Sequence, residues 1–140
     1  MVSEEVKKML EEGFSAEAQA SNLYYFFARK ADEEVSYASS AQEADLLREA
    51  ATLFRQIAEE ETVHAYIHLQ AMEGIGDTLQ NLKKASEIET SEYTTIFPSS
   101  VALLDMDGNQ RVASKFEAIS LAEKRHAESF DRLLKRFNKK

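Results

Sequence analysis

The sequence predicts an all-α protein, a bundle of four helices in a single domain that spans residues 1–140. One proline and four glycines occur in 140 residues, and so few helix breakers favour long helices over a many-turned β fold. Four stretches repeat apolar residues three or four positions apart, the spacing of an amphipathic helix. Hydrophobic residues make up 44% and charged residues 30% of the chain, a balance typical of a globular domain with a sizeable core.

The first helix is expected over residues 3–31, with Ser3 as its N-cap and two glutamates directly after the cap. A polar connector, about residues 32–39, follows it. Ser40 and Glu43 have the spacing of a capping box, which predicts that the second helix begins there.

Glycine, proline and turn residues predict the bounds of the two remaining helices. Gly74 and Gly76 predict the end of the second helix. The third helix is expected to begin near Asp77, and Pro98 should kink it or interrupt its hydrogen bonding. A turn is expected at residues 107–108. The fourth helix follows and ends in basic residues that suit a helix C-terminus, namely Lys135, Arg136, Lys139 and Lys140.

Composition excludes several functions. A net charge of −8 argues against nucleic acid and anionic membranes as partners. The absence of cysteine excludes disulfides, iron–sulfur clusters and Cys-ligated zinc. The sequence shows no signal-peptide pattern and no apolar run of 18 residues, so a cytoplasmic location is expected.

Carboxylates and histidines interrupt each apolar stripe near the middle of its helix, where the core should be. Buried carboxylates without partners are costly and repel one another, so either protons or cations must neutralise them. Glu-x-x-His occurs twice, and a Glu from each of two helices plus this motif from each of the other two is the ligand set of dimetal four-helix bundles. The candidate metal ligands are Glu17, Glu61, His64, Glu89, Glu92, Glu123 and His126.

More ordinary interpretations remain open for single residues. Either Glu-x-x-His motif taken alone is most simply a solvated helix face. His68, one turn after His64, is expected to support the site or to pack in the core, although it could be a ligand. Tyr24 could hydrogen-bond a ligand or simply pack in the core.

These motifs resemble the rubrerythrin family, and the resemblance covers nearly the whole chain. The matching segments are residues 14–24, residues 61–68, residues 81–98 and residues 122–128. The second glutamate of Glu89-x-x-Glu92 is the specific part, since most ferritin-like diiron bundles have one ligand there. The resemblance implies a ferritin-like four-helix bundle with a dimetal site at its middle.

The resemblance also implies a role for each ligand. Glu61 and Glu123 would bridge two iron ions, Glu17 and Glu89 would be terminal ligands, and His126 would hold one iron throughout. His64 and Glu92 would exchange at the other iron as its oxidation state changes, and they are therefore the candidate catalytic residues. A ferric ion favours a carboxylate more than a neutral imidazole, which makes such an exchange chemically reasonable. Manganese or a mixed iron–zinc pair would fit the same ligands.

The function implied is a non-haem diiron peroxidase, an oxidoreductase that reduces hydrogen peroxide to water in defence against oxidative stress. One alternative is a ferritin-like ferroxidase that uses oxygen, and another is a structural bundle whose Glu and His residues only hydrogen-bond each other. The sequence departs from the family in two ways. It lacks the cysteines of a rubredoxin domain, so a separate donor such as a rubredoxin must supply electrons, and Phe97 stands where the family often has tyrosine.

The connector between the second and third helices is short for this fold. In ferritin-like topology these helices run parallel, so the link must cross the length of the bundle. The few residues from Gly74 to Asp77 cannot span that distance. Either the segment from Leu79 to Ala85 unwinds into a crossover, or helix pairs swap between two chains. A homodimer, with swapping as one form of it, is therefore expected.

Overall fold

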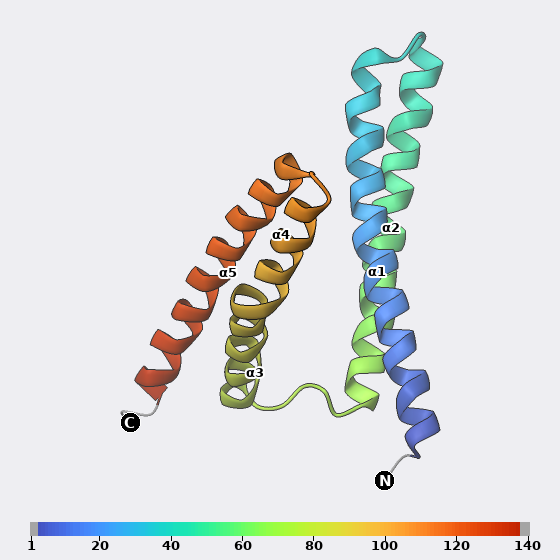
Figure 1. The fold of residues 1–140 in the computed structure, drawn as a ribbon. Coiled ribbons are helices and arrows are strands. Elements are labelled where there is room, and N and C mark those ends of the chain that lie inside the picture. The colour runs from blue at the N-terminus through green and yellow to red at the C-terminus, as the bar shows by residue number, and fades with distance from the viewer. Residues whose placement is uncertain (1–2, 138–140) are drawn as a thin grey trace. The chain divides into compact units, whose positions relative to one another are not determined.

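The computed structural model describes residues 3–137, and every regular element in that range is helical (Figure 1), which confirms the all-α prediction. The chain divides between Ile75 and Gly76 into two compact units. No helix in residues 3–137 is both long and apolar enough to cross a membrane. The first unit holds α1 (Glu4–Glu34), η1 (Val35–Tyr37) and α2 (Ala41–Ala71), and the second holds α3 (Thr78–Ser91), η2 (Glu92–Ile96), α4 (Phe97–Met106) and α5 (Gln110–Phe137).

Two of the predicted helix starts are confirmed by side-chain caps. Ser3 Oγ accepts a hydrogen bond from the Val6 amide at 3.3 Å, which satisfies one free amide of the first turn of α1. Ser40 Oγ accepts from the Glu43 amide at 3.1 Å and starts α2. The Glu43 carboxylate accepts from the Ser39 amide at 2.6 Å, so it reaches one residue further back than a standard capping box requires.

Helix α1 ends three residues later than the sequence predicted. It continues past Ala31 to Glu34, and a 3₁₀ turn then leads into the connector. Asp32, assigned to the connector from sequence, is helical and forms an ion pair with Arg55 of α2. Lys30 pairs with Glu34 at 3.4 Å one turn along. These ion pairs stabilise the last turn of α1, which its polar composition alone did not indicate.

Helix α2 ends before the glycines that were expected to end it. Its last residue is Ala71, and Glu73 takes the left-handed conformation with φ 54°. The Gly74 amide donates to the Leu69 carbonyl at 2.9 Å, as in a Schellman motif. Gly74 lies close to the same leucine, because a Cβ there would be 2.5 Å from Leu69 Cδ1 and would require that side chain to move.

Glu73→Gly should therefore stabilise the protein. A left-handed backbone costs an L-residue about 1–2 kcal/mol, and glycine removes this cost. Only part of the gain remains, because the unfolded chain of the glycine variant is more flexible. We expect a gain of up to about 1 kcal/mol in the free energy of unfolding, measured by urea denaturation with an unchanged m value. Glu73→Ala is the control, because it keeps the strain and should give no gain.

Small residues bring the two helices of the first unit into close contact. Ala28 of α1 and Ala51 and Ala58 of α2 are at most 1% exposed. Ser21 and Thr62 share a hydrogen bond of 2.8 Å between their hydroxyls across the same contact. The pairing therefore has a defined register, and this register sets which side chains of α1 and α2 lie opposite each other.

The second unit contains one helix that is interrupted and one that is not. Ser86 of α3 donates to Asp131 of α5 at 2.6 Å, which ties the two together. Between α3 and α4 lies the π-helix η2, where the Phe97 amide bonds the Glu92 carbonyl five residues back. Pro98 stands in the first turn of α4, where its missing N–H costs least. The predicted interruption at the proline is confirmed, and it takes the form of a π-helix.

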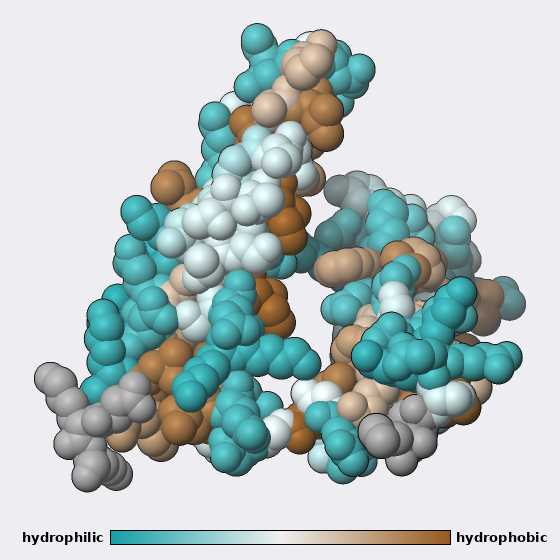
Figure 2. Space-filling model, turned by 60° about the horizontal axis from the view of Figure 1, so that its bottom comes forward, coloured by the Kyte–Doolittle hydropathy of each residue, from teal (hydrophilic) through white to brown (hydrophobic). Residues whose placement is uncertain are grey.

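Large apolar side chains remain at the surface of both units, as the brown patches in Figure 2 show. Leu53 of α2 is 54% exposed and Leu103 of α4 is 66% exposed. These side chains belong to the stripes that predicted a core. The turn at residues 107–108 and the basic Lys135 and Arg136 at the end of α5 are as predicted, whereas Lys139 and Lys140 lie outside the described residues.

Candidate metal centre

The first unit gathers three of the predicted ligands. Glu17 of α1 lies opposite Glu61 and His64 of α2, and one potential ligand atom of each residue lies within 4.8 Å of the other two. His64 Nδ1 is 3.0 Å from Glu61 Oε2. The i, i+3 spacing puts Glu61 and His64 on one face of α2, and the register of the α1–α2 pair supplies Glu17.

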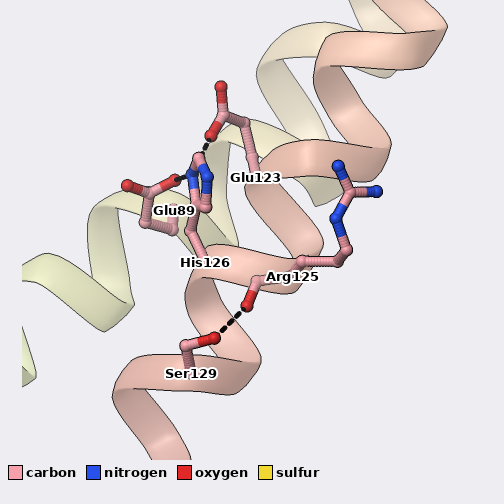
Figure 3. Close-up of polar contacts among 5 residues, drawn as sticks. All are labelled: Glu89, Glu123, Arg125, His126 and Ser129. Atoms are coloured by element: carbon pink, nitrogen blue, oxygen red, sulfur yellow. Dashed lines mark hydrogen bonds and ion pairs between the residues drawn. The ribbon is translucent and has the colours of Figure 1, made fainter.

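The second unit repeats this arrangement. Glu89 of α3 meets Glu123 and His126 of α5, again with one atom of each within 4.8 Å of the others. His126 Nδ1 lies 2.7 Å from Glu123 Oε2 and 3.3 Å from Glu89 Oε2, and both carboxylates turn toward the imidazole (Figure 3). The neighbouring Ser129 instead donates to the backbone carbonyl of Arg125 at 2.7 Å.

Carboxylates and imidazoles differ in exposure in both clusters. The side chains of Glu61 and Glu123 are 19% and 17% exposed, whereas those of His64 and His126 are 53% and 55% exposed. Two acidic groups are thus held side by side with little access to water, and in both clusters it is Nδ1 of the histidine that faces them. This arrangement favours a shared proton or a cation at each cluster.

The acidic pairs perturb each other's ionisation. The hydrogen bond between the two carboxyls raises the pKa of Glu17 and lowers the pKa of Glu61. Burial raises the pKa of Glu89, and its hydrogen bond with Glu123 acts in the same direction. One proton in each pair therefore relieves the repulsion between two carboxylates. A divalent cation can take the place of that proton, because carboxylate and imidazole donors suit iron, manganese and zinc.

The raised pKa of Glu89 makes the stability of the metal-free protein depend on pH. A group whose pKa is raised by folding contributes stability that is fully present below its ordinary pKa, here 4.5, and that is lost as the pH rises through the raised pKa. Glu89→Gln cannot ionise, so its advantage over the wild type should grow as the pH rises above about 4.5. Thermal unfolding in EDTA measures this, with Glu128→Gln, an exposed change on α5, as the control. A pH-independent difference would contradict the assignment.

Glu92 is the predicted ligand that lies outside both clusters. It is the first residue of η2, one turn after Glu89. A π turn contains one residue more than an α turn, so side chains after it are rotated relative to those before it. The remaining six predicted ligands come together in two groups of three.

Sequence reasoning missed the residues that position these groups. The Ser21–Thr62 and Ser86–Asp131 hydrogen bonds fix the helix pairs that carry the clusters. Ser21 and Ser86 are 6% and 8% exposed, and small hydroxyl residues within otherwise apolar stripes were the signal available. Gly13, whose backbone lies against the imidazole of His68, was also missed.

Two glutamates and a histidine in each of two helical units define the class of the protein: an all-α protein with the donor set of dimetal-carboxylate centres. The chain belongs to the rubrerythrin family, whose model matches residues 8–134.

Individual relatives agree with the family match. The chain is 29% identical to Rubrerythrin-1 of Clostridium acetobutylicum, covering 90% of this chain and 68% of that protein. It is 30% identical to rubrerythrin of Clostridium perfringens, with the same two coverages. It is 28% identical to rubrerythrin of Porphyromonas gingivalis, covering 91% of this chain and 65% of that protein. The chain therefore spans about two thirds of the length of these relatives.

Proposed function

We propose that this protein is a diiron peroxidase that reduces hydrogen peroxide to water with electrons from a separate redox protein such as a rubredoxin. The observation that carries the proposal is the pair of Glu–Glu–His clusters, one in each unit, in a chain of the rubrerythrin family. The reaction consumes two protons and two electrons for each peroxide and yields two waters. Two iron ions supply one electron each when they are bound.

Each dimetal site would combine one cluster of the first-unit kind with one cluster of the second-unit kind. In this proposal Glu61 and Glu123 would each hold both metals, and Glu17 and Glu89 would each hold one of them. The Nδ1 atoms of His64 and His126 already face the carboxylates, as an imidazole ligand must. Their second ring nitrogens then remain for a neighbouring carbonyl, carboxylate or water, as is usual for histidine ligands.

Glu92 is proposed as the ligand that exchanges with His64. Its place in a π-helix outside the Glu89 cluster supports this role, because irregular helical turns often mark functional positions. A carboxylate that joins the site would compensate the extra positive charge of the oxidised metals, and its withdrawal would return one ligand position to a neutral imidazole. Peroxide kinetics that are unchanged in Glu92→Ala would count against this exchange.

We also propose a homodimer in which each site combines the first unit of one chain with the second unit of its partner. Helix α3 begins at Thr78, directly after Asp77, which caps it, so residues 79–85 do not unwind into a crossover. The link from Met72 to Asp77 can reach about 20 Å, whereas α2, with 31 residues, is about 46 Å long. If α2 and α3 run parallel in the site, a link this short cannot join them within one chain and favours the swapped dimer. A size measurement that finds a monomer would exclude the swapped dimer.

An anaerobic experiment tests the function. The protein is loaded with two ferrous ions per chain and mixed with peroxide or with oxygen, and the ferric absorbance is followed by stopped flow. Much faster reaction with peroxide, with iron that is retained and can be reduced again, is the expected result. Faster reaction with oxygen and loss of iron would instead identify a ferroxidase. Failure to bind two metals would favour the structural bundle, in which the Glu–His hydrogen bonds seen here are the final state.

A further inference from the structure

The imidazole of His68 lies directly on the backbone of Gly13. A Cβ atom built at Gly13 would be 2.4 Å from His68 Cε1, 2.7 Å from Nδ1 and 2.8 Å from Nε2. Real Cβ atoms essentially never come within 3.0 Å of a non-bonded heavy atom, so the ring edge occupies the space that the Cβ of any other residue at position 13 would fill. Gly13 is therefore the residue of α1 that makes room for this histidine of α2.

The ring is held there although one of its polar atoms has no partner. Among the buried side-chain nitrogen and oxygen atoms of the described residues, His68 Nδ1 has no hydrogen-bond partner. Leaving a buried polar atom unpaired costs free energy, and such an atom in a folded protein needs an explanation. An apolar ring would fill the same space without that cost. The imidazole nitrogen can therefore gain a hydrogen bond if a neighbouring polar side chain turns toward it.

Helix geometry places Glu17 on the same face of α1 as Gly13, four residues further along. Side chains on a helix lean toward its N-terminus, so Glu17, one turn after Gly13, leans back toward the level of the imidazole. His68 leans in the same way toward His64, and thus toward the cluster. The hydrogen bond to Glu61 has the largest effect on the pKa of Glu17 and raises it, whereas the charge of His64 and, with a smaller effect, that of His68 act in the opposite sense.

We propose that His68 is a positioning residue of the metal site, whose Nδ1–H donates to the Glu17 carboxylate and so fixes the orientation in which Glu17 binds metal. The inference rests on the proposed dimetal function. His68 does not belong to the group of atoms within 4.8 Å that contains Glu17, Glu61 and His64, which is why the structure favours a positioning role over direct ligation. Carboxylates that bind metals are themselves commonly held by such hydrogen bonds.

Three variants separate this role from packing. His68→Phe keeps a ring of similar size over Gly13 without the N–H, whereas His68→Asn puts an amide N–H close to the place of Nδ1. Gly13→Ala leaves the histidine in the chain but pushes its ring away. Tyr66→Phe, which removes an exposed hydroxyl from the same helix, is the matched control.

Co²⁺ titration of the whole protein, followed by its visible absorption with a competing chelator, measures the effect. His68→Phe and Gly13→Ala should weaken binding of the metal held by Glu17 by roughly 10-fold or more, with a changed Co²⁺ spectrum. His68→Asn should restore most of the affinity and the wild-type spectrum, and Tyr66→Phe should match the wild type.

Thermal unfolding of the metal-free proteins gives the second measurement. A positioning role predicts that His68→Phe is at least as stable as the wild type without metal, although it binds metal less tightly, because the unpaired nitrogen is gone. Unchanged Co²⁺ affinity in His68→Phe would overturn the proposal, as would equal losses in the Phe and Asn variants. Failure of the wild type to bind two Co²⁺ ions per chain would overturn the dimetal function itself and this role with it.

Discussion

Replacing Glu123 with alanine is expected to end stoichiometric metal binding and to slow the reaction with peroxide by more than about 100-fold, since loss of a hydrogen bond to a ligand already costs about 10–100-fold. Glu123 is 17% exposed and lies 2.7 Å from His126 Nδ1. In the proposed site Glu123 would hold both metals, so its replacement would remove a ligand from each of them. Metal content after gel filtration and single-turnover stopped flow measure the two effects.

The control for Glu123 lies one and a half turns along the same helix. Glu128 is exposed, and Glu128→Ala should keep both metals and the full rate. The metal-free Glu123→Ala protein should be at least as stable as the metal-free wild type at neutral pH, because one member of a repelling acidic pair is gone. A Glu123→Ala protein that retains two metals would remove this residue from the ligand set.

Two inactive variants are expected to regain activity when they are combined. Glu61→Ala damages the cluster of the first unit, and Glu123→Ala damages that of the second. In a swapped dimer of one chain of each kind, one site combines the two damaged units and the other combines the two intact ones. Random pairing should therefore restore roughly a quarter of the wild-type sites, measured as peroxide turnover after the two chains are refolded together.

The same mixture distinguishes the swapped arrangement from an ordinary dimer. If each site were built within one chain, every site in the mixture would carry one damaged cluster, and no activity would return. The control is a mixture of Glu61→Ala with Glu17→Ala. Both changes lie in the first unit, so no pairing of these two chains contains an intact site.

Helix starts were predictable from the sequence because caps are local. Ser3, Ser40 and Asp77 each satisfy the amide three residues ahead, so neighbouring residues determine where the helix starts. The end of α2 was wrong for an equally physical reason. Glu73, and not a glycine, adopts the left-handed conformation, and Gly74 lies against Leu69; nothing in the sequence reveals that contact.

The candidate site was predictable as far as helix periodicity reaches. Spacing alone pairs Glu61 with His64 and Glu123 with His126. The bundle hypothesis predicted that Glu17 and Glu89 would join these pairs. The structure brings Glu17 to the first cluster and Glu89 to the second. The contact of His68 with Gly13 joins residues on two different helices, and the register of a helix pair cannot be read from periodicity. The sequence indicated the π-helix only as an expected kink or interruption at Pro98.

The boundary between Ile75 and Gly76 has a consequence for the order of events during synthesis. The first unit emerges from the ribosome with Glu17, Glu61 and His64, while Glu123 and His126 are still untranslated. Since units that emerge first can fold first, a nascent chain displays at most three of the seven donors for the seconds before the rest arrives. Tight capture of redox-active iron would then be the last step of assembly, after the chain has left the ribosome.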